Sequence, residues 1–245
     1  MKKKFLLNQV NKEPYIDLNI KDLQKWNKLD EITYAQMQRQ KYKYEFFQKA
    51  FDLIYDNTIV GDYFEFGVHR ARTFRFAMSQ AKRRNMKKIK FLAFDSFEGL
   101  PDVNNNIKQN DKFKKGLLIT SENKFKNYIK NFNFYKNNVK MIKGFYEKSL
   151  NKKLIFSLKK QNTKACLINF DCDLTQSVDQ ALKFSMNFLQ EGTILYFDDY
   201  FSSYKGNPNK GIPNIIKKRF KKSKFNIVEY LNIGYAAKSF IVYNK

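Results

Sequence analysis

Two short apolar runs in this chain each end in a cluster of acidic residues. Residues 165–170 lead into an Asp-Cys-Asp cluster at 171–173, and residues 193–197 lead into an Asp-Asp pair at 198–199. Continuous apolar runs of this length are typical of parallel strands buried on both faces. About 25 residues separate the clusters, enough for the helix and turn of one parallel crossover. We therefore expect both clusters to face each other at the carboxyl edge of one sheet.

The rest of the chain alternates between short apolar runs and amphipathic stretches. Such alternation predicts an α/β fold with a doubly wound, mostly parallel sheet. The expected strands span residues 63–68, 89–94, 139–142, 165–170 and 193–197, and the expected helices span residues 33–56, 74–84, 122–131, 177–189 and 214–222. Two further runs, 226–231 and 238–243, flank Gly234 and predict an antiparallel hairpin at one edge of the sheet.

At 245 residues the chain has the length of one α/β domain with additional elements. We expect residues 1–60 to form an N-terminal arm and helix, and residues 61–245 to form the α/β domain, as one structural unit. The polar stretch 100–120 predicts a long loop, either a lid or a plain insertion. Neither a membrane span nor a signal peptide is expected from the hydropathy pattern, so the predicted location is cytoplasmic.

The chain carries a formal net charge of +24. Such a charge suits a nucleic acid or another polyanion, and a lysine-rich genome composition is the alternative explanation. We favour the second explanation, because the lysines are spread along the chain and no nucleic-acid-binding motif is present. The two cysteines, Cys166 and Cys172, fit no disulfide or zinc spacing, and we expect both to be reduced packing residues.

The ends of the first two predicted strands carry residues suited to a polar ligand. The first strand contains Glu65 and, near its end, Gly67, which would let a ligand approach the backbone closely. The second is followed directly by Asp95, whose carboxylate suits the two hydroxyls of a ribose, with a simple strand-end cap as the alternative. The glycine-rich turn of a dinucleotide-binding fold is absent from the sequence, as is a P-loop.

The carboxylates of Asp171, Asp198 and Asp199 offer three oxygen ligands to a hard divalent cation such as Mg²⁺ or Mn²⁺. Zinc is disfavoured because nitrogen and sulfur ligands are lacking. The only histidine, His69, follows a predicted strand, and we expect it to be structural. Helix capping is the alternative role for the aspartates. Their placement at two strand ends favours a site, and hence an enzyme.

Five short motifs also occur in the order found in a known family. They lie at residues 64–68, 94–101, 143–150, 171–174 and 198–200. In these motifs the chain resembles the macrocin O-methyltransferase family, over roughly residues 33–205. The Asp-Ser-Phe-Glu-Gly-Leu-Pro run at 95–101 is the most specific part. The chain departs from the family at Ala71 and Arg72, where the family usually has small residues, often two glycines.

The resemblance implies a Rossmann-like class I methyltransferase sheet with an N-terminal helical extension, binding S-adenosylmethionine. By their matching positions, the residues that would bind this cofactor are Glu65, Gly67, Asp95, Ser96, Phe97, Gly144 and Phe145. Asp171, Asp198 and Asp199 would match the magnesium ligands of the family, and Asp171 its general base.

The function implied by the resemblance is metal-dependent O-methylation of a sugar hydroxyl. The acceptor would be a small sugar or sugar nucleotide, such as a precursor of a surface (capsule) polysaccharide. One alternative is a nucleic-acid methyltransferase, which the positive charge would suit, although its catalytic motif is absent. Another is a non-catalytic polyanion-binding protein with a degenerate methyltransferase fold, which the Ala71-Arg72 pair would suit. Nucleic acid is not the partner we expect, and assembly into a homo-oligomer stays open.

Overall fold

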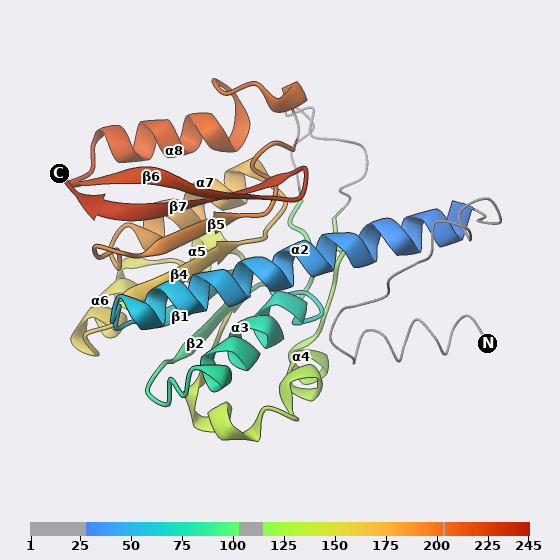
Figure 1. The fold of residues 1–245 in the computed structure, drawn as a ribbon, viewed down its shortest axis with the longest axis horizontal. Coiled ribbons are helices and arrows are strands. Elements are labelled where there is room, and N and C mark those ends of the chain that lie inside the picture. Colours follow the sequence, from blue (N-terminus) through green and yellow to red (C-terminus); the bar gives the residue numbers. More distant parts are fainter. Residues whose placement is uncertain (1–27, 103–114, 203) are drawn as a thin grey trace.

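The computed structural model describes residues 28–102, 115–202 and 204–245. Within these ranges, seven strands form one sheet in the order β3-β2-β1-β4-β5-β7-β6 (Figure 1). The strands are β1 (Asp62–Phe66), β2 (Phe91–Asp95), β3 (Val139–Lys143), β4 (Ala165–Phe170), β5 (Ile194–Phe197), β6 (Phe225–Ile233) and β7 (Ala237–Asn244). Strands β1 to β5 pair in parallel, whereas β7 pairs antiparallel with both β5 and β6. The predicted mostly parallel sheet with an antiparallel C-terminal hairpin is confirmed.

Helices cover both faces of the sheet. They are α2 (Lys28–Asp56), α3 (Arg72–Arg83), α4 (Glu122–Ile129), α5 (Tyr146–Ser149), α6 (Lys152–Lys160), α7 (Thr175–Ser185) and α8 (Gly211–Lys221), with short 3-10 turns η2 (Asn133–Asn138) and η3 (Tyr204–Gly206). Strand side chains alternate between two cores: Tyr63 packs with the helix α2 and α3 residues, and Phe64 with those of α7 and α8. None of the helices in the described ranges is long and apolar enough to cross a membrane.

Helix α2 is the N-terminal helical extension expected from the sequence. It runs for 29 residues from Lys28 to Asp56, so it ends where the sequence predicts but begins five residues before the predicted start at residue 33. Its predicted apolar stripe, Phe47, Ala50, Phe51 and Ile54, is fully buried against the sheet and α3. The N-terminal turns of α2 extend past the end of the sheet (Figure 1). The helix therefore brings side chains over the carboxyl edge of the strands.

Several boundaries differ from the predicted ones for local reasons. The strand predicted to reach residue 68 ends at Phe66, because Gly67 turns the chain with a φ of 86°. The helix predicted to reach residue 189 ends at Ser185, although Phe188 beyond it is also buried. Helix α6 was not predicted, since its apolar residues are few and lysines flank them. Residues 1–27 of the predicted arm and 103–114 of the predicted loop lie outside the described residues.

The order of the strands reverses between β1 and β4. In open α/β sheets the crevice at such a reversal, beyond the carboxyl ends of the strands, is where ligands bind. Gly67 lies at this point, with its N–H donating to the carbonyl of Phe94 at 2.9 Å. A Cβ atom on Gly67 would lie 2.0 Å from the carbonyl oxygen of Asp171. Only glycine allows β1 and β4 to leave the sheet this close together.

Candidate active site

A cavity of about 220 Å³ lies at the carboxyl ends of β1 to β4. Five of the seven residues predicted to bind the cofactor line it: Gly67, Asp95, Ser96, Gly144 and Phe145. Asp171 also lines this cavity, so the cavity reaches the acidic cluster at the end of β4. The other two residues, Glu65 and Phe97, are not among its lining residues.

Asp95 is held in place by the backbone around the crevice. Its Oδ1 accepts a hydrogen bond from the N–H of Phe97 at 2.7 Å, and its Oδ2 accepts one from the N–H of Val68 at 2.8 Å. Burial raises the pKa of this carboxyl. Each carboxylate oxygen keeps a further lone pair for a hydroxyl donor. Asp95 is therefore a fixed acceptor at the end of β2, in the position that suits a diol.

Phe97 shapes the turn that follows Asp95. Its side chain is buried and meets the ring of Phe125 edge to face, with 5.7 Å between the ring centres. Its backbone has a φ of 56°, which is uncommon for a residue with a bulky side chain. The neighbouring Ser96 hydroxyl donates to the carbonyl of Gly99 at 2.7 Å, which closes the turn. Phe97 thus fixes the turn that carries the cavity-lining residues Asp95 and Ser96.

Glu65 does not line the cavity but lies in a buried hydrogen-bond network. The Thr73 hydroxyl donates to its Oε1 at 2.7 Å, and the Tyr63 hydroxyl donates to its Oε2. The amide of Asn169 donates to the Tyr63 hydroxyl at 3.4 Å. Burial raises the pKa of Glu65 to about 7, and the hydrogen bonds only partly oppose this. The network ties the ends of β1 and β4 to the first turn of α3.

The raised pKa of Glu65 predicts a specific dependence of stability on pH. The folded protein holds this proton more tightly than the unfolded chain, so the associated stability is complete below about pH 4.5. It is lost as the pH rises to about 7, by roughly 3 kcal/mol at most. Glu65→Gln should flatten the dependence in this window, which urea unfolding at pH 5 and pH 8 will measure. An equal fall in unfolding free energy between pH 5 and pH 8 in wild type and variant would mean that Glu65 does not cause this pH dependence. Glu147→Gln, at an exposed position, is the control and should leave the dependence unchanged.

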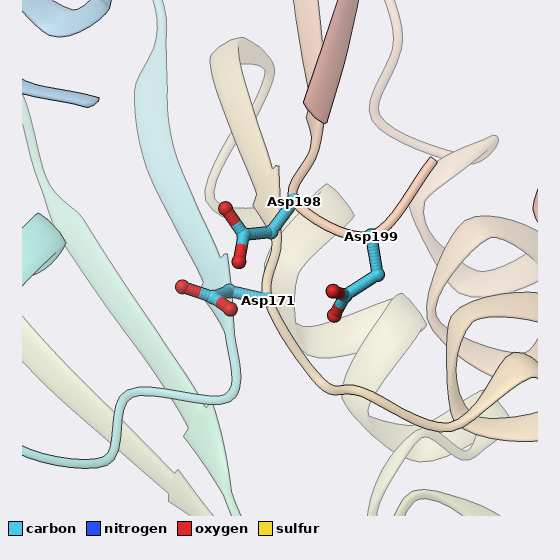
Figure 2. Close-up of side chains that lie close together, drawn as sticks. All are labelled: Asp171, Asp198 and Asp199. Carbon is cyan, nitrogen blue, oxygen red and sulfur yellow. The ribbon is translucent and has the colours of Figure 1, made fainter. Parts of the chain in front are cut away.

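The two acidic clusters meet in space, as the sequence predicts. Phe170 at the end of β4 lies in register with Phe197 at the end of β5, so the aspartates that follow are neighbours. One carboxylate oxygen from each of Asp171, Asp198 and Asp199 lies within 4.8 Å of the other two. Figure 2 shows the three carboxylates gathered around one space. Like charges held this close require cations nearby.

Helix α2 supplies two such cations. The Lys43 Nζ donates to Asp171 Oδ2 at 3.0 Å and lies 2.8 Å from Asp198 Oδ1. The Arg39 Nη2 donates to Asp198 Oδ2 at 2.7 Å and lies 3.5 Å from Asp199 Oδ1. Burial favours a higher pKa for Asp198, but Lys43 and Arg39 together hold its pKa below the usual range. Burial raises the pKa of Asp171, and the charge of Asp198 raises it further.

The donor set around this space fits a hard divalent cation. Asp171 Oδ1 and Asp199 Oδ2 have no hydrogen-bond or ion-pair partner within residues 28–102, 115–202 and 204–245. The Tyr196 hydroxyl donates to Asp198 Oδ1 at 2.7 Å, which fixes that carboxylate. Carboxylate oxygens are the ligands that Mg²⁺ and Mn²⁺ prefer. The two open oxygens and Asp198 therefore suit such an ion, with Lys43 and Arg39 offsetting part of the negative charge.

Sequence reasoning missed two charged residues of this site, and it gave no separate role to a third. Lys43 and Arg39 continue the buried stripe of α2 upstream of Phe47 at four-residue spacing, and basic residues on an apolar stripe indicate buried partners. Asp173 belongs to the first acidic cluster and lines the cavity. Burial, with the charges of Asp199 and Asp198, raises its pKa to about 7. A second carboxyl thus faces the same space as Asp171.

The turn after β1 contains the departure noted in the sequence. Ala71 is buried and takes a left-handed conformation, with φ of 55° and ψ of 28°, where a glycine would be unstrained. His69 lines the cavity, and its Nδ1 lies 2.7 Å from the carbonyl oxygen of Leu118 and 3.2 Å from the Thr120 hydroxyl. These contacts fasten the segment after residue 115 to the turn, which agrees with the structural role predicted for His69.

Comparison with known proteins addresses both the fold and the family. The structure of the O-methyltransferase NovP has a TM-score of 0.66 and 16% identity, covering 82% of this chain and 79% of NovP. The calicheamicin methyltransferase CalS11 has a TM-score of 0.65 and 16% identity, covering 97% and 90%. A second, apo structure of CalS11, described as a TDP-rhamnose 3'-O-methyltransferase, has a TM-score of 0.57 and 14% identity, covering 97% and 92%. At these identities, the structures show a shared fold.

Comparison with curated proteins finds no match. The family model of the macrocin O-methyltransferases (TylF) matches residues 2–209. That range holds all of the predicted cofactor residues and all three aspartates of the acidic cluster. The chain therefore belongs to the macrocin O-methyltransferase family.

Proposed function

We propose that this protein transfers a methyl group from S-adenosylmethionine to a sugar hydroxyl. The observation that carries the proposal is that one cavity contains both Asp95, a fixed acceptor for a diol, and Asp171 of the acidic cluster. An S-adenosylmethionine molecule whose ribose is held at Asp95 would then direct its sulfonium methyl group toward the carboxylates. The sugar acceptor is supported by the family and by CalS11, which is described as acting on TDP-rhamnose.

The predicted cofactor residues take direct and indirect roles in this proposal. Asp95 would accept the two ribose hydroxyls, and Gly67 would let the methionine part approach the backbone. Ser96, Gly144 and Phe145 would border the nucleoside. Glu65 would act indirectly, by fixing the end of β1 to α3 through Thr73, and Phe97 would shape the turn after Asp95.

The reaction forms an oxygen–carbon bond, breaks the sulfur–methyl bond and releases the proton of the hydroxyl. Asp171 is the proposed general base: Lys43 holds its Oδ2 at 3.0 Å, and its Oδ1 has two lone pairs, one for the ion and one to accept the proton. The ion pair with Lys43 also fixes the direction in which the free oxygen points. The remaining task of the protein is to align the acceptor oxygen with the methyl carbon and the sulfur.

Asp171, Asp198 and Asp199 would hold the Mg²⁺ or Mn²⁺ ion. When bound, such an ion lowers the pKa of a coordinated hydroxyl. Lys43 and Arg39 form ion pairs with these carboxylates and so help to hold them together. The proposed acceptor is a sugar nucleotide or another precursor of a surface (capsule) polysaccharide, and the proposed location is cytoplasmic.

Transfer from methyl-labelled S-adenosylmethionine to a panel of acceptors tests the proposed function. The panel should contain free sugars, sugar 1-phosphates, nucleotide sugars and RNA, with products read by mass spectrometry. We expect labelled methyl on a sugar hydroxyl, and much slower transfer by Asp171→Asn. Labelling of RNA alone would favour the nucleic-acid alternative. Absence of both transfer and cofactor binding would favour the non-catalytic one.

Removal of divalent metal should abolish transfer, since the acceptor hydroxyl would lose its activation. Transfer in excess chelator, with and without added Mg²⁺ or Mn²⁺, measures this directly. Asp199→Asn should weaken Mn²⁺ binding in electron paramagnetic resonance titrations, because Asp199 Oδ2 is one of the two open oxygens. Asp56→Asn, at the exposed end of α2, is the matched control. Full activity in chelator, with no Mn²⁺ bound, would remove the metal from the proposal.

A further inference from the structure

Three helices that cover the same side of the sheet form a strongly basic surface. Helices α6, α7 and α8 all pack on the core that contains Phe64, and their outer surface is called the α6–α8 face below. Together they carry nine basic residues and a single acidic one, Asp179. Arg219 donates to both carboxylate oxygens of Asp179, at 2.8 and 2.6 Å. No acidic side chain of these helices is therefore left to pair with their lysines.

The lysines of the α6–α8 face are exposed, and in the part of the chain that the structure describes none of them has an ion-pair partner. They are Lys152, Lys153, Lys159 and Lys160 of α6, Lys183 of α7, and Lys217, Lys218 and Lys221 of α8. Cations that lack carboxylate partners leave a positive field at the surface, which attracts an anionic partner.

A lysine-rich composition alone does not account for this face. Helices α2, α3 and α4 cover the other core of the same protein, and they carry eleven basic and six acidic residues. A composition bias would add lysines to both sides of the sheet, but it would not remove the acidic residues from one of them. The α6–α8 face therefore differs from the rest of the helical surface in its lack of negative charge.

An exposed phenylalanine lies in the middle of the lysines of α6. The side chain of Phe156 is 73% exposed, whereas Leu158 of the same helix is buried in the core. Residues three and four positions apart are neighbours on a helix surface. The residues at these distances from Phe156, on both sides, are Lys152, Lys153, Lys159 and Lys160. One exposed apolar side chain is ordinary, but this one is surrounded by four unpaired cations.

An apolar tip among lysines matches the interface of a lipid bilayer. An aromatic side chain can enter the boundary between headgroups and acyl chains. The stems of the lysines can lie along it while their ammonium groups stay with anionic headgroups, which attract clustered lysines. A single-stranded nucleic acid is less suited, because its binding needs a basic groove with aromatic rings for successive bases. Phe156 is alone on a helix surface and lines neither cavity near the acidic cluster.

We propose that the α6–α8 face binds reversibly to an anionic phospholipid surface, with Phe156 inserted among the headgroups and the lysines around it in contact with them. This property goes beyond the proposed function and does not depend on it. Ser177 and Gln180 of α7 line the cavity at the carboxyl ends of β1 to β4. Binding through this face would therefore bring that cavity close to the lipid surface.

Cosedimentation with vesicles of phosphatidylcholine, with and without phosphatidylglycerol, tests the proposal without cofactor, metal or acceptor. We expect wild type to bind the anionic vesicles at least about tenfold more tightly than the neutral ones, and less tightly as salt is raised. Affinity for the anionic vesicles should fall at least about tenfold in a variant that combines Lys152→Gln, Lys153→Gln, Lys159→Gln and Lys160→Gln. Phe156→Ser should weaken binding at least about threefold, because the inserted ring is lost.

The matched control removes the same charge from exposed positions outside the α6–α8 face. It combines Lys87→Gln, Lys88→Gln, Lys124→Gln and Lys126→Gln. Its affinity should stay within about twofold of wild type, since charges more than a Debye length from the lipid contribute little.

Three results would overturn the proposal. Equal loss of binding in the two fourfold variants would mean that net charge alone attracts the vesicles. Equal affinity of wild type for anionic and neutral vesicles, or unchanged affinity in Phe156→Ser, would contradict the contact described above. Polyuridylate that displaces the vesicles, and whose own binding is weakened in Phe156→Ser, would assign the face to nucleic acid. Methyl transfer to a sugar is measured separately, so its failure would leave this inference standing.

Discussion

Replacing Lys43 by methionine should lower the free energy of unfolding by about 3–5 kcal/mol, the range expected when one partner of a buried ion pair is removed. Methionine fills similar space but leaves Asp171 without its cation and Asp198 with Arg39 alone. The carboxylates of the cluster would then repel one another in a buried setting. Urea unfolding of wild type and Lys43→Met measures the difference.

Lys49→Met is the matched control, because Lys49 lies on the same helix and its side chain is exposed. We expect it to change stability by less than about 0.5 kcal/mol. Equal stability of the two variants would mean that Lys43 does not hold the cluster together. The docking of α2 over the carboxyl edge would then rest on its apolar stripe alone.

Gly67→Ala should be the most disruptive single-methyl change near the site. A Cβ atom there would lie 2.0 Å from the carbonyl oxygen of Asp171, which is backbone and cannot move aside. The φ of 86° adds strain for any residue other than glycine. We expect a loss of more than about 3 kcal/mol in unfolding free energy, together with loss of cofactor binding, because β1 and β4 must separate.

Gly206→Ala is a control that separates the steric clash expected at Gly67 from the backbone strain of a positive φ. Gly206 also has a positive φ, of 68°, but a Cβ atom there meets nothing within 4 Å. Its replacement should therefore lose only about 1 kcal/mol, from backbone conformation. Similar losses at both positions in thermal or urea unfolding would show that the close approach of β1 and β4 is not what requires Gly67.

The central part of the sheet could be predicted because its strands are continuous apolar runs. The strand predicted at residues 165–170 coincides with β4, and the one at 193–197 differs from β5 by one residue. Parallel pairing of these two strands then requires Asp171 and Asp198 to be neighbours. The acidic cluster therefore follows from local pattern and one rule of topology.

The cations of the site were harder to predict, because they come from a helix more than 100 residues away in sequence. Nothing in a sequence with 47 basic residues marks Lys43 and Arg39 except their place on the buried stripe of α2. The hydrogen-bond partners of Glu65 follow from the alternation of side chains between the two faces of a strand. Glu65 and Tyr63 lie two residues apart and therefore face the same side of β1, toward Thr73 of α3. Glu65 therefore lies near the end of β1 and yet does not line the cavity.

Titration of S-adenosylhomocysteine into wild type, Asp95→Ala and the control Asp56→Ala tests the proposed cofactor site most directly. Asp95 lines the cavity as a fixed, half-buried acceptor, whereas Asp56 is exposed at the end of α2. We expect saturable one-to-one binding by wild type and by Asp56→Ala, and binding about 10- to 100-fold weaker by Asp95→Ala. That range corresponds to the roughly 1.5–3 kcal/mol of hydrogen bonds to a charged group. No binding by wild type, or equal affinity in Asp95→Ala, would contradict a cofactor held at the carboxyl ends of β1 and β2.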